Sequence, residues 1–170
     1  MMCKISYYFV FYISMLSCRD KADKEKYIIP MGYRGRVTVF FNQINGAPKS
    51  FENDFRIYKI PDNGILLTRF EDNPGILSVE NSELQYIYLD FSSGKQENIT
   101  LKPLTPDSDK VYIMNGSSGR INGYSYYQFI VDTLKNISSY YEKNDQGFYS
   151  EPKDKWKEIF EKAGLFKNDK

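Results

Sequence analysis

The sequence predicts a mainly β fold, either an antiparallel β-sandwich or a small barrel, with one or two helices at its C-terminal end and an α+β class overall. Short alternating runs, separated by turn residues, follow one another from Tyr27 to Val131, as in the strands of half-buried sheets. The hydrophobic period then lengthens from two residues toward about 3.6, the helical period. The chain has 170 residues, of which 41% are hydrophobic and 26% charged, a balance typical of one folded domain.

The first strands are predicted around a recognisable turn. Arg36–Phe41 alternates between two faces, and Phe55–Ile60 and Ile65–Phe70 flank the turn Pro61–Gly64. Proline presets φ at the start of this turn, and the Asn-Gly pair that follows accepts positive φ. We therefore expect the two flanking strands to form a hairpin.

A second hairpin is expected further along the chain. Leu84–Phe91 alternates tyrosines with aliphatic residues, and Ser92–Lys95 then turns the chain into Asn98–Leu104. Two more strands are expected at Lys110–Asn115 and Tyr124–Val131, separated by the glycine- and serine-rich connection Gly116–Arg120.

Helices are predicted after the strands. Asp132 is placed to cap a helix whose apolar residues, Leu134, Ile137 and Tyr141, share one face. A last helix is expected to begin near Pro152 and to end at Gly164. Its apolar positions at i, i+3, i+4 and i+7 are Trp156, Ile159, Phe160 and Ala163, so we expect Trp156 to anchor this helix on the sheet.

The amino terminus has the pattern of a secretory signal. After Lys4, the apolar run Ile5–Leu16 has 12 residues and would cover only about 18 Å as a helix, whereas the hydrocarbon core of a bilayer is about 30 Å thick. A small residue, Ser17, stands directly before Cys18, as a signal peptidase requires. This ending resembles the lipobox of bacterial lipoproteins, with Met15 where the usual pattern has leucine, and that resemblance implies that Cys18 is lipidated.

Three segments follow from this pattern. Residues 1–17 are predicted to be a lipoprotein signal peptide, residues 18–26 a charged tether, and residues 27–170 a single β-rich domain with a C-terminal helical segment. Both cysteines, Cys3 and Cys18, lie at or before the cut. The mature chain would therefore have no cysteine for a disulfide or for a thiolate metal site.

The segment Tyr27–Gly35, with the later segment Tyr58–Thr68, carries a resemblance to a known family. Its Ile29-Pro30-Met31-Gly32-Tyr33-Arg34-Gly35 stretch and the second Ile-Pro turn at Pro61 are similar to an uncharacterised family of bacterial exported proteins, a domain of unknown function that opens with Ile-Pro-x-Gly-Tyr-x-Gly. The resemblance implies an exported β domain and supplies no catalytic residues.

Charge and composition exclude several classes of function. The predicted mature chain carries 22 basic and 22 acidic residues, whereas nucleic-acid binding rests on a cationic surface. No histidine is present anywhere in the sequence, which excludes imidazole bases and histidine-ligated metals. We therefore expect no cofactor, no metal and no nucleic-acid partner.

The predicted function is that of a lipid-anchored, non-catalytic binding module of the bacterial cell envelope, facing the periplasm or the outside of the cell. Its partners would be the membrane, through the lipid on Cys18, and a protein or glycan ligand. The candidate binding surface consists of exposed strand tyrosines, because tyrosine offers a rigid ring with a polar tip; its members are Tyr86, Tyr88, Tyr124 and Tyr126.

Two alternatives remain open at this point. One is a small envelope hydrolase that acts on glycans, because paired carboxylates need no histidine for that chemistry; the candidate acids are Glu71, Asp72, Glu80, Glu83, Asp90 and Asp132. The other is an immunity-type or accessory protein that binds a polypeptide through its tyrosine-rich sheet face.

Overall fold

A computed structural model describes residues 22–75, 77, 82–143, 149–150 and 154–165. Its elements in chain order are β1 (Lys24–Pro30), β2 (Gly35–Phe40), β3 (Phe51–Glu52), β4 (Phe55–Lys59), β5 (Ile65–Leu67), β6 (Leu84–Leu89), β7 (Gln96–Asn98), β8 (Val111–Ile121), β9 (Tyr124–Thr133), the 3-10 helix η1 (Leu134–Tyr140), β10 (Glu142–Lys143), β11 (Tyr149–Ser150) and α1 (Lys155–Ala163).

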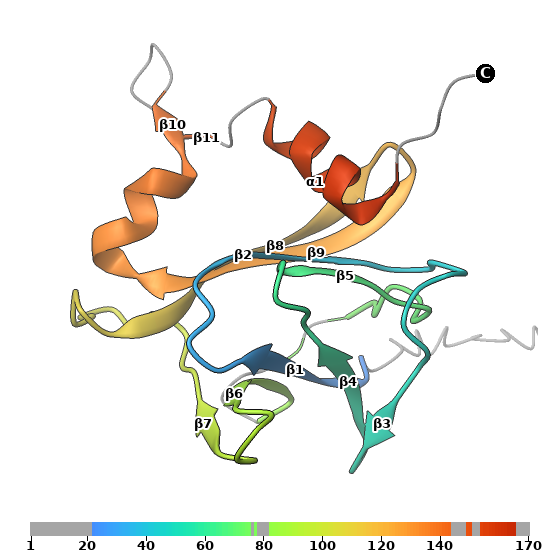
Figure 1. Ribbon diagram of the computed structural model, residues 1–170, viewed down its shortest axis with the longest axis horizontal. Helices are drawn as coiled ribbons and strands as arrows, with labels where there is room; N and C mark the ends of the chain where they lie inside the picture. Colours follow the sequence, from blue (N-terminus) through green and yellow to red (C-terminus); the bar gives the residue numbers. More distant parts are fainter. Residues whose placement is uncertain (1–21, 76, 78–81, 144–148, 151–153, 166–170) are drawn as a thin grey trace, which may run out of the picture.

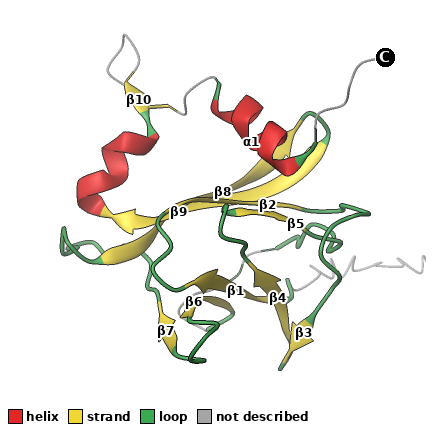
Figure 2. Ribbon diagram, in the orientation of Figure 1, coloured by secondary structure: helices red, strands yellow, loops and turns green. Residues whose placement is uncertain are grey.

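The strands build two stacked sheets (Figure 1). The first sheet has the order β3-β4-β1-β6-β7, the second has the order β5-β2-β9-β8, and β10 and β11 form a separate pair. The main core lies between the two sheets, and the helices η1 and α1 cover the outer face of the second sheet (Figure 2). The predicted mainly β fold with C-terminal helices is therefore confirmed, in the form of a sandwich.

The strand directions differ from the expected antiparallel arrangement, because both sheets are mixed. Strand β1 pairs in parallel with β4 and with β6, and β2 pairs in parallel with β5. The reason lies in two arches, β1–β2 and β4–β5, each of which carries the chain from the first sheet to the second. The arches lie side by side in register, with Tyr27 opposite Tyr58 in one sheet and Thr38 opposite Ile65 in the other.

The predicted hairpin around Pro61–Gly64 is consequently wrong, although its turn is present. The Gly64 N–H donates to the Pro61 carbonyl at 2.9 Å, and the Ile65 N–H donates to Asn63 Oδ1 at 3.0 Å. Local turn chemistry reverses the chain here, but β4 and β5 pair with different sheets. Both strands carry apolar side chains that become buried. Because the chain crosses between the layers here, both strands contribute to the core.

The second predicted hairpin is present, but its second strand covers Gln96–Asn98 and not the expected Asn98–Leu104. The two strands expected after it form a further hairpin that is longer than predicted. Strands β6 and β7 pair antiparallel, with Tyr88 opposite Glu97. Strand β8 continues through the segment Gly116–Arg120, which we had expected to be a connection, and the chain turns only at Asn122-Gly123. The glycines are strand residues because they face tyrosines of β9: a Cβ on Gly116 would lie 2.7 Å from the Tyr127 hydroxyl.

The last helix follows its prediction closely. Helix α1 ends at Gly164, which has a left-handed φ of 66°, and the N–H groups of Gly164 and Leu165 donate to Glu161 and Phe160, as in a Schellman motif. Trp156 packs on Tyr126 of β9 with ring centroids 4.7 Å apart. Trp156 therefore anchors α1 on the second sheet as expected, whereas Pro152 lies outside the described residues.

Asp132 has a different role from the predicted helix cap. It lies within β9, the residue before η1 is Thr133, and no side-chain cap bond is formed there. The buried Asp132 carboxylate instead accepts hydrogen bonds from Asn136 Nδ2 at 3.0 Å and from the Tyr140 hydroxyl at 2.5 Å. Asp132 thus links the far end of η1 to the strand. Such contacts matter here because the backbone hydrogen bonds of a 3-10 helix have poor geometry and stabilise it only weakly.

The fold also begins earlier than the predicted boundary at residue 27. Residues 24–26, assigned to a tether on their charge, are the start of β1, the central strand of the first sheet. Ala22 and Glu25 are buried. The alternation explains the error: Lys24 and Lys26 stand on the outer face, where both ammonium groups lie over the Phe55 ring, while Glu25 points into the sandwich.

The arch turn provides a test of the fold. A Cβ on Gly64, which has φ of +75°, would lie 2.0 Å from the Tyr33 hydroxyl oxygen and 2.5 Å from the Arg36 carbonyl. We expect Gly64→Ala to lower the free energy of unfolding by about 3 kcal/mol or more, since backbone strain and a clash with main chain add. The measurement is urea denaturation of the purified domain.

Gly94→Ala is the matched control, because Gly94 has nearly the same φ of +72° but no atom within 4 Å of its added Cβ. Its cost should be only about 1 kcal/mol, that of the left-handed conformation alone. Equal losses in the two variants would show that the close approach of the arches is unimportant for stability.

Candidate ligand-binding cleft

An open cleft of about 640 Å³ lies where the amino-terminal end of β1 meets the β8–β9 hairpin. The first sheet contributes Glu25, Tyr27 and Leu84 to its described walls, and the second sheet contributes the hairpin residues Ser118, Gly119, Arg120, Ser125, Tyr126 and Tyr127. The loop after β5 adds Asp72, Asn73, Pro74 and Gly75. The cleft therefore opens between the two layers of the sandwich.

Among the described residues that line this cleft, Glu25 is the one charged side chain that is also buried, at 6% exposure. Strand geometry places it there, because Glu25, Tyr27 and Ile29 alternate with more exposed residues and face the second sheet. Glu25 is thus the first inward-facing residue of β1, and its carboxylate lies at the edge of the core.

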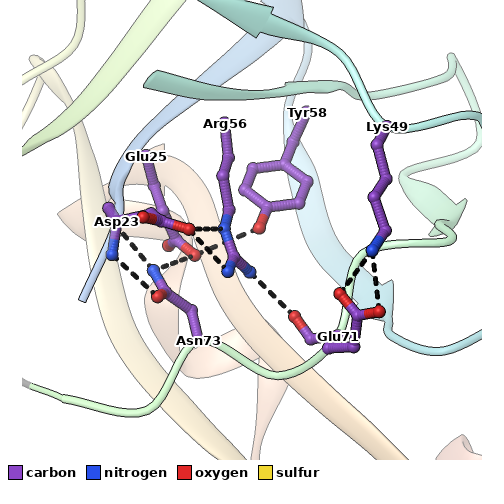
Figure 3. A network of polar contacts seen from close by, with 7 residues as sticks. All are labelled: Asp23, Glu25, Lys49, Arg56, Tyr58, Glu71 and Asn73. Carbon is purple, nitrogen blue, oxygen red and sulfur yellow. Dashed lines mark hydrogen bonds and ion pairs between the residues drawn. The ribbon is translucent and has the colours of Figure 1, made fainter. Parts of the chain in front are cut away.

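Three neutral donors hold the Glu25 carboxylate, and Figure 3 shows two of them, Tyr58 and Asn73. The Tyr27 hydroxyl donates to Oε2 at 2.8 Å, while the Tyr58 hydroxyl and Asn73 Nδ2 donate to Oε1 at 3.1 and 2.9 Å. Among the described residues, no cation forms an ion pair with Glu25. The carboxylate is therefore oriented by hydrogen bonds rather than by a salt bridge.

Burial dominates the electrostatics of this group. Desolvation raises the pKa of the Glu25 carboxyl above its ordinary value, and the hydrogen bonds from Tyr27, Asn73 and Tyr58 oppose that rise without cancelling it. Burial and the nearby Glu25 charge also raise the pKa values of the Tyr27 and Tyr58 hydroxyls. Both phenols consequently stay protonated and act as donors to the carboxylate.

A second layer of polar contacts lies outside this carboxylate, along the rim of the sheet (Figure 3). Arg56 donates through Nε to Asp23 Oδ2 at 2.8 Å, and its Nη2 lies 2.7 Å from the same oxygen. Arg56 Nη1 also donates to the Glu71 carbonyl, and Lys49 pairs with the Glu71 carboxylate. This rim network ties β1, β4 and the loop around residue 71 together, and so positions Asn73.

The two tyrosines that donate to the Glu25 carboxylate belong to a row of stacked rings. Tyr27 stacks on Tyr58 and on Tyr86, with ring centroids 4.8 and 5.3 Å apart. The three residues occupy equivalent positions on the parallel strands β4, β1 and β6. The Tyr86 and Tyr127 hydroxyls lie 2.7 Å apart, so the row is linked to the second sheet at the floor of the cleft.

The four tyrosines of the predicted surface do not form one exposed patch. Tyr86 and Tyr88 face the core and are only 4% and 6% exposed. Tyr124 and Tyr126 lie on the outer face of the second sheet, where they pack beneath α1. Strand alternation buries Tyr86 and Tyr88 and leaves Tyr124 and Tyr126 half-buried, and of the four only Tyr126 lines the cleft.

The predicted carboxylate candidates are scattered as well. Asp72 lines the cleft, whereas Asp132 lies within β9 beside η1, and Asp90 binds the turn residues Ser92 and Ser93. Those hydrogen bonds hold the pKa of Asp90 well below its usual range. Glu80, together with the proposed lipid attachment point Cys18, lies outside the described residues.

Sequence reasoning missed Glu25, which is central to the cleft. A signal was available: the inward positions Tyr27 and Ile29, extended backward by two residues, reach Glu25. The charges of Lys24 and Lys26 concealed this continuation.

Within the described ranges, no group of three or more acidic, histidine or cysteine side chains is placed to hold a metal, and no helix there is long and apolar enough to cross a bilayer.

The fold and the cleft define a β-sandwich domain with an open groove at one end. Residues 21–145 match a family described as "Family of unknown function (DUF6843)", so the chain belongs to that family. The prediction of an uncharacterised family is thereby confirmed. A search of curated proteins finds no match.

Among solved structures, the chain is similar to a crystal structure described as that of a "Putative Lipoprotein from Bacillus anthracis". The two chains are 15% identical and superpose with a TM-score of 0.55, covering 84% of this chain and 94% of that one. At this level of identity, the likeness shows a shared fold.

The buried carboxylate predicts a specific pH dependence. Because the folded-state pKa of Glu25 lies above its ordinary value of 4.5, its contribution to stability is full below that value and is lost as the pH rises through the folded pKa. We expect the free energy of unfolding of the wild type to fall relative to that of Glu25→Gln as the pH rises above 4.5 and passes through the raised folded-state pKa of Glu25. Urea denaturation at several pH values measures this difference.

Asp62→Asn is the control for the loss of a carboxylate, because Asp62 is exposed on the turn between β4 and β5. A difference between wild type and Glu25→Gln that stays constant across the pH range, or that changes in the opposite direction, would contradict the role of burial at Glu25.

Proposed function

We propose that this protein is a lipid-anchored, non-catalytic protein of the bacterial cell envelope that binds its ligand in the Glu25 cleft. The observation that carries the anchor is Cys18, which follows a small residue at the end of an apolar run too short to span a bilayer. The domain would face the periplasm or the outside of the cell.

Two further facts support the anchor. The chain belongs to a family whose match begins at residue 21, three positions after the proposed attachment point. The similar Bacillus anthracis structure is itself described as a "Putative Lipoprotein". Several acyl chains on one residue, each worth about 0.8 kcal/mol per buried methylene, would retain the protein on the membrane permanently.

The cleft is the surface that best supports binding. Its volume of about 640 Å³ is in the range of small-molecule and cofactor sites, which combine apolar walls with a few fixed polar groups. Here Phe41, Leu77 and Leu84 are apolar wall residues, while Glu25 and Arg120 supply charge. The polypeptide-binding alternative rested on the strand tyrosines, of which Tyr86 and Tyr88 are buried in the core and Tyr124 and Tyr126 are half-buried in the packing against α1. The cleft therefore replaces them as the candidate surface.

One observation favours a second candidate, the glycan hydrolase. Glu25 and Asp72 line the same cleft, and the raised pKa of Glu25 is a property that glycosidases use in their general acid. Against this, both Glu25 oxygens already accept hydrogen bonds from neutral donors. An acceptor-only carboxylate satisfies those donors best, whereas a general acid needs a proton directed at the substrate.

The lipid anchor is tested by replacing the cysteine. Cys18→Ser is expected to stop maturation or to release the protein into the soluble fraction, because the thiol that carries the lipid is gone. Cell fractionation and mass spectrometry of the purified native protein measure both effects. Cys3→Ser is the matched control, since Cys3 lies in the segment that would be removed.

Membrane retention of Cys18→Ser equal to that of wild type, together with a native chain that still begins at Met1 and carries an unmodified Cys18, would overturn the lipoprotein assignment.

The hydrolase candidate is tested separately with purified protein and soluble envelope glycans. We expect no release of reducing ends above the background measured without protein. Release that is lost in Asp72→Asn and in Glu25→Gln, but kept in the exposed control variant Asp62→Asn, would establish the hydrolase and refute the non-catalytic assignment.

A further inference from the structure

The chain is firmly held in the fold from Ala22 onward. Ala22 is 7% exposed and lies against Gly75, where an added Cβ would be 3.0 Å from that of Ala22. The next residue, Asp23, exchanges two hydrogen bonds with Asn73: its N–H donates to Oδ1 at 3.0 Å, and its carbonyl accepts from Nδ2 at 2.8 Å. The start of the domain is therefore a fixed point.

The distance from this point to Cys18 has a covalent limit. Three residues lie between Cys18 and Ala22, and the four Cα–Cα steps that join the two span at most about 14 Å in an extended chain. On the proposed lipid attachment, Cys18 lies at the membrane interface, where the headgroup layer is itself several Å thick. One end of the sandwich must then lie at the bilayer surface.

That end, which we call the anchor-side end, consists of loops 42–50 and 70–75 and the β8–β9 turn at 122–123. The Phe41 N–H donates to the Ser125 carbonyl and the Asn42 N–H to the Phe70 carbonyl, so these segments are neighbours. All of them lie on the right in Figure 1, at the same end as the start of β1.

Basic side chains balance the exposed acids of the anchor-side end, since Lys49, Arg56 and Arg120 pair with Glu71, Asp23 and Asp72. Beside these pairs, this end presents side chains that suit a membrane contact. Ile44 is 86% exposed at the tip of loop 42–50. Arg69 lies beside this loop, where its Nε donates to the Gly46 carbonyl, and the Arg120 side chain is 70% exposed near the hairpin turn. An apolar residue beside guanidinium groups matches a surface of acyl chains and phosphates.

We propose that the anchor-side end, with Ile44 in the lead and Arg69 and Arg120 beside it, rests on the phospholipid bilayer. This inference rests on the proposed lipid anchor. The Glu25 cleft opens at the same end, between Asn73 and Arg120, so the cleft faces the membrane surface and its ligand binds there.

The test uses two single-cysteine variants of the full-length, lipidated protein, Ile44→Cys and Asp62→Cys. Asp62 is also exposed, and it follows the carboxyl end of β4, whereas the anchor-side end lies at the amino end of β1 and β4. After maturation the Cys18 thiol carries lipid and Cys3 has been removed, so only the introduced cysteine reacts with a fluorescent probe. The labelled proteins are reconstituted in vesicles of phosphatidylcholine and phosphatidylglycerol that contain headgroup-labelled nitroxide lipid.

The expected result is quenching at position 44 that exceeds quenching at position 62 by at least about twofold, because the two ends differ in distance from the bilayer by most of a strand length. Equal quenching, or stronger quenching at position 62, would overturn the orientation. Mass spectrometry of the same preparations separates the two proposals: a chain without lipid overturns the anchor and the orientation together, whereas a lipidated chain without differential quenching overturns the orientation alone.

Discussion

Tyr27 lies between the rings of Tyr58 and Tyr86 on three parallel strands, and most of the molecule depends on that stacking. The stacking holds β1, β4 and β6 in register, and the three strands run in the same direction. Parallel neighbours cannot be joined by a tight turn, so the chain must leave the first sheet after β1 and again after β4. The second sheet, with its own parallel pair of β2 and β5, follows from those two departures.

The same row of rings makes it possible to bury Glu25. A carboxylate that leaves water loses solvation and remains charged only where hydrogen bonds replace the water. Tyr27 and Tyr58 provide two of these bonds because their rings already stand side by side, and Asn73 provides the third. The rim contacts of Arg56 with Asp23 and with the Glu71 carbonyl then hold the loop that carries Asn73. Fold and cleft thus share one set of residues, and a change in either affects both.

The sequence patterns correctly predicted those features that depend mainly on residues close together in the chain. Turn chemistry located the reversal at Pro61–Gly64, and the apolar spacing around Trp156 located α1 together with its contact on the sheet. The partner of a strand is decided by long-range packing, and for that reason the arch at Gly64 was taken for a hairpin. Glu25 was missed on similar grounds, since a charged residue between two lysines indicates solvent by composition, and only the inward face of a central strand gives it another environment.

The short link before Ala22 limits what a lipid-anchored form of this domain can do. A flexible linker of many residues would let a binding domain search a volume that grows with linker length. On the proposed lipid attachment, the three residues between Cys18 and Ala22 would instead keep this sandwich within about one strand length of the bilayer. The ligand must then come to the membrane, or be part of it. On that proposed attachment, the fixed start of β1, bound to Asn73 on one side and continuing into Glu25 on the other, would place the cleft at the membrane boundary. The boundary would then select the ligands that the cleft meets.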